Sequence, residues 1–484
     1  MLPLSRRRFV RLAAGAGAAG LAGAAAGFRP AAADDAIQLR VETHVIEVDG
    51  KAATVLGVRQ PDGTPGLTIA ADRRFRVELE NRLAEDTLIH WHGLLPPYQQ
   101  DGVPEISQPA LPPGQRYAYD FALGHPGTYW MHSHQGLQEQ RLLAAPLIVT
   151  DPAAAGLDEQ QVVVLLGDFS FKDPAEILAG LRQRPAATAT GGTGGSGSMA
   201  GMKMGGSGSM AGMKMDLNDV DYDAYLANER TLADPEIVRV EPGGRVRLRL
   251  INGGSGTNFV IDCGALTASL VAVDGQLVVP VAGSRFDLAL AQRIDLRLTL
   301  PPGGGAWPIL ALREGDRART GIVLATPGAA VTRLAAQGEA PARRLTLHLE
   351  QQLRPRDPPA RRPADRRLPL DLTGDMAAYR WGLNGKEYPD GSPLAVAKGE
   401  RVELEMRNRT GMSHPMHLHG HVFQVVAIDG RRFDGALRDT VLVPPERAVT
   451  IAFDADNPGR WAFHCHVLYH MEVGMFTTVA YDQY

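Results

Sequence analysis

The sequence reads His464-Cys465-His466-Val467-Leu468-Tyr469-His470-Met471-Glu472-Val473-Gly474-Met475 near the end of its 484 residues. This segment offers a soft thiolate, thioethers and imidazoles, a donor set that suits copper better than zinc, calcium or magnesium. Cysteine and histidine with a weak axial methionine are the usual ligands of an electron-transferring mononuclear copper. If the segment begins as a β-strand, Cys465 points to one face while His464 and His466 point to the other. Two short covalent paths would then join a copper on the Cys465 face to metal on the opposite face.

The pattern His-x-His recurs through the chain, which has only 14 histidines. The pairs are His90/His92, His132/His134, His417/His419 and His464/His466. In an extended strand each pair places two imidazoles on one face. One such pair is weak support for a metal site, but these eight imidazoles are enough for three copper ions and too many for one.

These segments resemble the four copper motifs of the multicopper oxidases, and they are similar to those of bacterial laccase-like and cuprous oxidases. The resemblance lies in His90-Trp91-His92-Gly93, Trp130-Met131-His132-Ser133-His134, His414-Pro415-Met416-His417-Leu418-His419-Gly420 and His464 to Met475. It implies four coppers per chain: one type 1, one type 2 and a type 3 pair. The implied ligands are His414, Cys465, His470 and Met475 for type 1, His90 and His417 for type 2, and His92, His132, His134, His419, His464 and His466 for type 3.

The length of 484 residues predicts about three domains, and the composition predicts a turn-rich, all-β architecture. Glycine (54) and proline (34) are plentiful, and segments such as 245–251 and 401–406 alternate polar and apolar residues as half-buried strands do. The resemblance implies three consecutive cupredoxin-like Greek-key β-sandwich domains. We expect these at residues 34–151, 159–330 and 340–484. The second contains no histidine and supplies no copper ligand, so we expect it to act as a spacer that brings the outer domains face to face.

Residues 1–33 are typical of a twin-arginine signal peptide. Ser5-Arg6-Arg7-Arg8-Phe9 precedes an Ala/Gly/Leu stretch and then Ala31-Ala32-Ala33, where we expect cleavage. The apolar stretch is short and only weakly apolar, which disfavours a stable membrane anchor. The sequence therefore predicts recognition by the twin-arginine export machinery and a soluble protein in the periplasm.

The charge of the mature chain excludes one class of partner. Residues 1–33 carry five arginines and no acid, so 50 Lys+Arg against 54 Asp+Glu becomes 45 against 54, a net charge of −9. Such a chain lacks the positive surface that binds nucleic acid. We expect a monomer whose partners are dioxygen and Cu(I) or a small phenolic reductant.

A methionine repeat interrupts the second block. The sequence of residues 194–204 is repeated without change at 205–215. Gly/Ser-rich sequence has nothing to bury, so its methionines have no core to fill. Thioethers select Cu(I), and we expect the repeat to capture it; alternatively, it is an idle linker. The methionines concerned are Met199, Met202, Met204, Met210, Met213 and Met215.

Three further residues are candidates for the reaction. Asp101 matches a family carboxylate near the trinuclear site, where dioxygen reduction consumes protons; it would otherwise be a turn residue. Glu472 follows the laccase pattern, whereas cuprous oxidases have the acid one place earlier, at the position of Met471. Met412 matches a methionine that binds substrate copper in cuprous oxidases, although Thr410 replaces their aspartate.

The sequence leaves the substrate open. A cuprous oxidase would take electrons from Cu(I) and serve copper tolerance, while a laccase would take them from phenols or aromatic amines. A copper storage or carrier protein has no need of an oxygen-reducing cluster. A copper nitrite reductase has no use for a type 3 pair.

Overall fold

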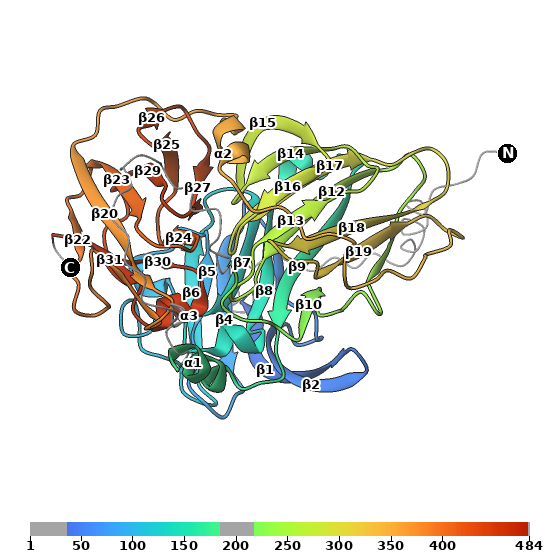
Figure 1. The fold of residues 1–484 in the computed structure, drawn as a ribbon, viewed down its shortest axis with the longest axis horizontal. Helices are drawn as coiled ribbons and strands as arrows, with labels where there is room; N and C mark the ends of the chain where they lie inside the picture. Colours follow the sequence, from blue (N-terminus) through green and yellow to red (C-terminus); the bar gives the residue numbers. More distant parts are fainter. Residues whose placement is uncertain (1–35, 184–216, 483–484) are drawn as a thin grey trace, which may run out of the picture. The chain divides into compact units, whose positions relative to one another are not determined.

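The computed structural model describes residues 36–183 and 217–482, which form β-sheets joined by loops and short helices (Figure 1). The signal peptide and the methionine repeat predicted from the sequence lie outside the described residues. Within the described part, no helix is both long enough and apolar enough to cross a membrane.

The first pair of sheets comes from residues 37–150. The sheets have the strand orders β2-β1-β4-β6 and β3-β8-β7-β5. The strands are β1 (Ile37–Val48), β2 (Lys51–Arg59), β3 (Leu67–Ala70), β4 (Arg74–Asn81), β5 (Ile89–His92), β6 (Arg116–Ala122), β7 (Gly127–Ser133) and β8 (Ala144–Thr150). Because β1 is antiparallel to β2 but parallel to β4, the chain crosses between the sheets. Phe75, Trp91 and Leu147 are among the fully buried residues between them.

The second pair of sheets comes from residues 160–325. Their strand orders are β10-β9-β12-β17-β14-β15 and β11-β19-β18-β13-β16. The strands are β9 (Gln160–Phe169), β10 (Ala224–Ala227), β11 (Ile237–Arg239), β12 (Arg245–Asn252), β13 (Phe259–Asp262), β14 (Ala268–Val273), β15 (Gln276–Gly283), β16 (Arg285–Leu288), β17 (Arg293–Thr299), β18 (Ala306–Arg313) and β19 (Arg319–Ala325). The predicted strand at 245–251 is therefore present as β12.

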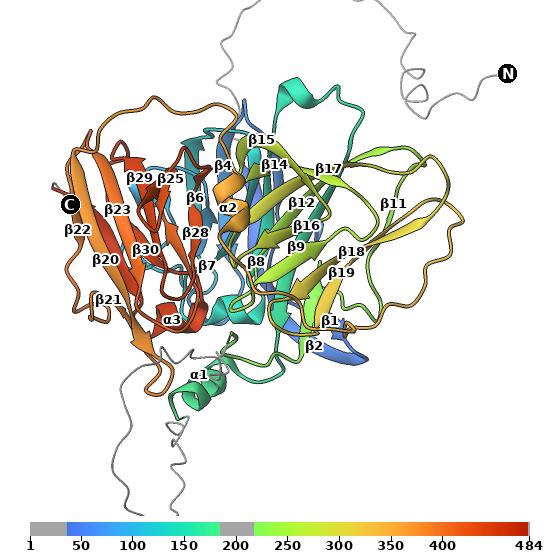
Figure 2. The ribbon, with the colours of Figure 1, turned by 45° about the horizontal axis from the view of Figure 1, so that its top comes forward.

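The third pair of sheets comes from residues 366–481. One has the order β21-β20-β23-β29-β25-β26, with β27 beside β25, and the other β22-β31-β30-β24-β28. The strands are β20 (Arg366–Asp375), β21 (Arg380–Leu383), β22 (Leu394–Val396), β23 (Arg401–Asn408), β24 (His414–Leu418), β25 (Phe423–Ile428), β26 (Arg431–Arg432), β27 (Leu437–Arg438), β28 (Thr440–Val443), β29 (Ala448–Asp454), β30 (Arg460–Cys465) and β31 (Phe476–Tyr481). Figure 2 shows these strands in orange and red, beside the green strands of the second pair.

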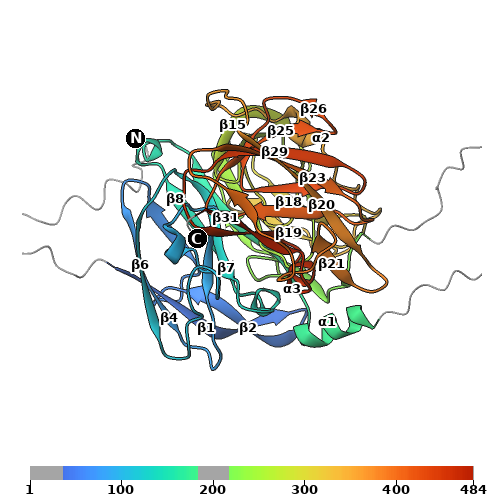
Figure 3. The same cartoon turned by 90° about the vertical axis from the view of Figure 1, so that its left-hand side faces the viewer.

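The described fold also contains three short α-helices, α1 (Pro174–Arg182), α2 (His348–Gln352) and α3 (Leu468–Glu472), besides 3-10 turns. Helix α1 begins where the Asp173 side chain accepts a hydrogen bond from the Ala175 amide and Pro174 fills the first turn. Its buried Ile177 and Leu181 belong to the same apolar cluster as Trp381 of the third sandwich. Figure 3 shows α1 near α3 and β21.

Candidate metal centre

Strands of the first and third sandwiches bring the eight His-x-His histidines together. In the first sandwich β5 pairs with β7, so that His90 lies opposite His132. In the third, β24 pairs with β30, so that His417 lies opposite His464. The eight side chains belong to residues that are 0 to 9% exposed: His90, His92, His132, His134, His417, His419, His464 and His466.

Ring nitrogens of these histidines face one another at short range. His464 Nε2 lies 3.0 Å from His419 Nε2 and 3.3 Å from His134 Nε2. A second contact joins His92 Nδ1 and His132 Nε2 at 3.4 Å. A third joins the Nε2 atoms of His90 and His417 at 3.5 Å. His466 Nε2 is buried without a hydrogen-bond partner among the described residues. Such inward-facing nitrogens fit bound metal ions.

The other ring nitrogens have acceptors, which fixes the orientation of each ring. His90 Nδ1 donates to the Asp101 carbonyl oxygen at 2.8 Å, and His464 Nδ1 donates to the Cys465 carbonyl oxygen at 2.9 Å. His417 Nδ1 is 2.8 Å from the Asp439 carbonyl oxygen. The outward nitrogens therefore carry protons, and the inward nitrogens keep lone pairs for metal.

Burial keeps most of this cluster uncharged in the metal-free protein. Loss of solvation, and then the neighbouring rings, hold the pKa values of His92, His132, His134, His417, His419 and His466 well below the ordinary range. The pKa of His464 falls to about 4, chiefly because of burial. Neutral imidazole is the form that binds metal, so no proton has to be removed from these six rings or from His464 at neutral pH.

Two carboxylates contact the cluster from the first sandwich. Asp101 Oδ2 accepts from His419 Nδ1 at 2.8 Å, and its Oδ1 lies 3.3 Å from His90 Nδ1. Glu139, in the 3-10 helix Gln138–Arg141, has Oε2 2.9 Å from His132 Nδ1. Its Oε1 lies 3.8 Å from His466 Nδ1, and burial raises the pKa of Glu139 well above its usual range.

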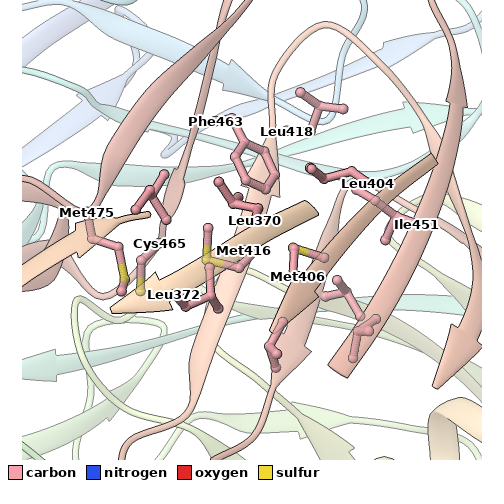
Figure 4. Packing of buried hydrophobic residues seen from close by; sticks show 14 of the residues in the cluster. Leu370, Leu372, Leu404, Met406, Met416, Leu418, Ile451, Phe463, Cys465 and Met475 are labelled. Atoms are coloured by element: carbon pink, nitrogen blue, oxygen red, sulfur yellow. The ribbon is translucent and has the colours of Figure 1, made fainter. Parts of the chain in front are cut away.

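A separate three-residue group surrounds the cysteine of β30. Cys465 Sγ is 3.6 Å from His414 Nδ1 and 3.7 Å from His470 Nδ1, and these two nitrogens are 3.3 Å apart. Ligand atoms at such separations fit one metal ion with bonds of about 2 Å. Figure 4 shows the sulfur atoms of Cys465 and Met475 next to each other, and the Cys465 amide donates to the Met475 carbonyl at 3.1 Å. Burial raises the pKa of the Cys465 thiol, so metal binding there must displace a proton.

The outer nitrogens of this group are also held. His414 Nε2 lies 2.7 Å from Thr410 Oγ1. His470 Nε2 lies 2.8 Å from Asp219 Oδ2, although its geometry falls short of a hydrogen bond. That Asp219 oxygen accepts from the Tyr379 hydroxyl at 2.6 Å. The His470 ring stacks on Trp381 with centroids 4.1 Å apart.

The structure thus gathers the twelve residues implied as copper ligands into two buried groups, one of eight histidines and one containing Cys465 and Met475. Asp101 contacts the first group, and buried Met412 belongs to the apolar cluster that contains Cys465. Glu472 differs: it is exposed at the end of α3, and the described residues show no hydrogen bond or ion pair of its carboxylate with either group. The six methionines of the repeat lie outside the described residues.

Sequence reasoning missed three carboxylates: Glu139, Asp219 and Asp439. Asp219 follows the repeat closely, and Glu139 follows His134 by five positions, but acids are common in this chain (54 Asp+Glu). Spacing alone therefore gave no signal for them.

Comparison with known proteins gives matches along nearly the whole chain. Multicopper oxidase family models match residues 40–154, 160–332 and 361–483. The chain is 33% identical over 409 residues to multicopper oxidase MmcO of Mycobacterium tuberculosis, covering 84% of this chain and 79% of that protein. It is 28% identical to copper resistance protein A of Escherichia coli, covering 84% and 86%.

The structure also resembles solved structures. The laccase from Botrytis aclada matches with a TM-score of 0.74 at 22% identity, over 92% of this chain and 87% of that one. This likeness is one of fold, and with the paired sheets it confirms the prediction of an all-β protein with three consecutive cupredoxin-like Greek-key sandwiches.

Proposed function

Because this chain belongs to the multicopper oxidase family, we propose that it oxidises a small reductant at a type 1 copper and reduces dioxygen to water at a trinuclear copper cluster. The family membership itself makes the chain a copper-binding oxidoreductase. One observation carries the finer proposal. Cys465 belongs to one buried group, while its two neighbours in the sequence, His464 and His466, belong to the other.

We assign the ligands of four coppers by their positions in the two groups. His414, Cys465 and His470 with axial Met475 hold type 1 copper, and His90 and His417 hold type 2. The type 3 pair takes His92, His132 and His466 on one side and His134, His419 and His464 on the other, in agreement with the facing nitrogens. Bound copper supplies the one-electron steps that carry electrons from the reductant to dioxygen.

The protein chain supplies the electron route and a proton-holding group. Electrons pass from the Cys465 side chain through the backbone of its two neighbours, which are ligands of the cluster. Asp101 serves the cluster as a proton-holding group, because its buried Oδ1 has no hydrogen-bond partner in the described part of the chain while Oδ2 accepts from His419. The contacts give no comparable support for Glu472.

Cu(I) is the substrate that we favour. The methionine repeat, residues 194–215, lies in the sequence between two described segments that both contact the third sandwich. The segment before it contains α1, whose Leu181 belongs to the apolar cluster that also contains Cys465 and Trp381. The segment after it reaches Asp219, which contacts His470. Capture of Cu(I) by the tethered thioethers would raise its local concentration beside His470. Met412 would assist as a further thioether near His414.

Cuprous oxidases have a carboxylate at the position that Thr410 occupies in this chain. We infer that Asp219 takes over the role of that carboxylate. Thr410 here contacts His414, so it fills that position without a charge. Asp219 instead brings a carboxylate to the other type 1 histidine. A general laccase acting on phenols remains the second candidate. One sequence relative and one solved structure that carry the name laccase match over most of the chain.

A comparison of two substrates tests the choice. Turnover of Cu(I) and of a phenol is measured for the wild type, for a deletion of residues 194–215 and for a variant with leucine at all six methionines. The six Met→Leu substitutions keep the repeat's length and Gly/Ser composition, so any change in KM reports the loss of the sulfur atoms. We expect both variants to raise the apparent KM for Cu(I) while phenol oxidation stays at the wild-type level. An unchanged KM for Cu(I) in the leucine variant would contradict the capture role and favour the laccase.

The same proposal includes the protein's place and organisation. We propose export through the twin-arginine machinery, cleavage near Ala33 and action in the periplasm as a monomer in copper tolerance. The twin-arginine pattern at residues 5–11 supports this.

We propose domains at residues 34–151, 159–330 and 340–484, each of which encloses one pair of sheets.

A further inference from the structure

The second sandwich, which supplies no histidine, places a buried arginine beside the trinuclear site. Arg293, the first residue of β17, is 0% exposed. Its guanidinium binds both carboxylate oxygens of Asp439 from the third sandwich, with Nη1–Oδ1 at 2.7 Å and Nη2–Oδ2 at 2.5 Å. Its Nε donates to the carbonyl oxygen of Thr128 in β7 of the first sandwich at 3.2 Å. One side chain therefore contacts all three sandwiches.

The residue before it makes a second contact with the same segment. Gln292 Nε2 donates to the carbonyl oxygen of Thr440 at 3.1 Å. Asp439 and Thr440 are thus held from the second sandwich at a carboxylate and at a backbone oxygen. Gly93 is packed against the ion pair as well: a Cβ there would lie 2.5 Å from Arg293 Nη2.

Asp439 and Thr440 in turn hold two histidines of the cluster. Asp439 Oδ1 lies 3.1 Å and Thr440 Oγ1 3.2 Å from His92 Nε2. This leaves His92 Nδ1 facing His132, as described above. Thr440 Oγ1 also lies 3.1 Å from His417 Nδ1. His92 and His417 come from different sandwiches, and their rings stack with centroids 3.7 Å apart.

The carboxylate of Asp439 could compete for a place on the metal. Oxygen of Asp439 and nitrogens of His92 and His417 lie close enough together to bind one metal ion. A bidentate arginine occupies both carboxylate oxygens in a fixed plane, which a lysine cannot do. Arg293 therefore binds both oxygens of Asp439 while Oδ1 faces His92 Nε2.

We propose that Arg293 is a positioning residue for the trinuclear cluster: through Asp439 it fixes which nitrogen of His92 binds copper and excludes the carboxylate from coordination. The second sandwich then acts directly on the oxygen-reducing site in addition to spacing the other two. This inference rests on the proposed function, because it requires the cluster to hold copper.

The test is Arg293→Lys in the full-length, copper-loaded protein, with Arg438→Lys as the matched control. Arg438 is also buried, and it binds Asp274 at 3.0 Å and Glu350 at 2.8 Å, but the described structure shows no contact between it and a cluster histidine. Three quantities are measured: copper per chain, blue type 1 absorbance per chain, and the electron paramagnetic resonance spectrum of the type 2 copper. We expect Arg293→Lys to lose at least one copper per chain, or to alter the type 2 spectrum, with the blue absorbance unchanged. We expect wild-type values for Arg438→Lys.

A second variant tests the same proposal if Arg293→Lys does not fold. Arg293→Gln combined with Asp439→Asn replaces the ion pair by two amides and leaves no unpaired buried charge. The same loss of cluster copper with retained blue absorbance is expected. Full copper with an unchanged type 2 spectrum in either folded variant would overturn the positioning role, as would an equal loss in Arg438→Lys. A wild-type protein without cluster copper would instead overturn the proposed function.

Discussion

At the scale of single residues, the histidine nitrogens that face away from the cluster matter as much as those that face inward. The motifs predicted which histidines assemble, because His-x-His in a strand fixes their common face. They could not predict Glu139 or Asp439, which reach the outer nitrogens of His132 and His92 only after the chain has folded. In the sequence, a buried carboxylate of this kind looks like any surface acid, because only its tertiary neighbours distinguish it.

Cys465→Ser removes the thiolate on which the type 1 site depends. We expect loss of the blue absorption and nearly all oxidase activity, because serine is a poor copper ligand in place of a soft thiolate. The cluster histidines are untouched, so about three coppers per chain should remain. Absorption spectra and metal analysis of the purified variant check this. A variant that stays blue and active would refute the assignment of Cys465.

Asp219→Asn tests the carboxylate next to His470. The amide keeps the size of the side chain but removes its charge, so we expect the apparent KM for Cu(I) to rise about tenfold, equivalent to about 1.4 kcal/mol. Asp221→Asn is the control, because its side chain is 98% exposed and only two residues away. Steady-state kinetics with Cu(I) measure both. Equal effects of the two substitutions would mean that Asp219 contributes only general negative charge.

At the scale of elements, one pair of strands connects the two metal groups. The register of β24 and β30 sets Met416 opposite Cys465 and His417 opposite His464. The sequence predicted strands at 245–251 and 401–406, and both are present as β12 and β23. It did not predict that β12 is buried on both faces from Leu248 onward. Arg249, on its expected polar face, pairs with Asp295 and Thr128 where the first sandwich covers the sheet.

Gly102→Ala probes the turn that carries Asp101. Gly102 has φ +85°, and a Cβ there would lie 1.9 Å from the Ile89 carbonyl oxygen, directly before His90. We expect a loss of more than about 2 kcal/mol in unfolding free energy from backbone strain and overlap. Displacement of His90 and Asp101 should also lower cluster copper while blue absorbance remains.

The control for this prediction is Gly114→Ala. Gly114 has φ +74° but open space within 4 Å of its Cβ position, so it measures the cost of the backbone conformation alone. Chemical denaturation and metal analysis compare the two variants. If Gly114→Ala were as damaging as Gly102→Ala, the close approach to Ile89 would not be the cause.

At the scale of the whole molecule, the first and third sandwiches share the cluster histidines, and the second holds them in place. The sequence could predict that the second block has no imidazole ligand. It could not predict the role of Arg293, because a buried arginine between three sandwiches has no local pattern. The motifs therefore predicted the proposed metal ligands, whereas only the tertiary contacts show the groups that orient them.

Metal-free protein should lose stability as the pH falls below about 6.5. Seven cluster histidines have pKa values below the usual range, so the unfolded chain binds protons that the folded chain does not; they are His92, His132, His134, His417, His419, His464 and His466. Each of these histidines lowers the free energy of unfolding by roughly 1 kcal/mol for each pH unit below about 6.5. Buried Glu139, Glu314, Glu350 and Asp439, with pKa values raised by burial, act in the opposite direction but are fewer. Urea midpoints of copper-free protein at pH 7.5 and 5.5 measure this, and equal midpoints would contradict it.

Copper content measured together with dioxygen consumption tests the proposed function most directly. The twelve motif ligands divide into a group of four and a group of eight, so fully loaded wild-type protein should hold four coppers per chain. It should give the blue absorption of one type 1 copper and reduce dioxygen to water with little release of peroxide. Active protein with only two coppers per chain, or with hydrogen peroxide as its main product, would contradict the trinuclear cluster.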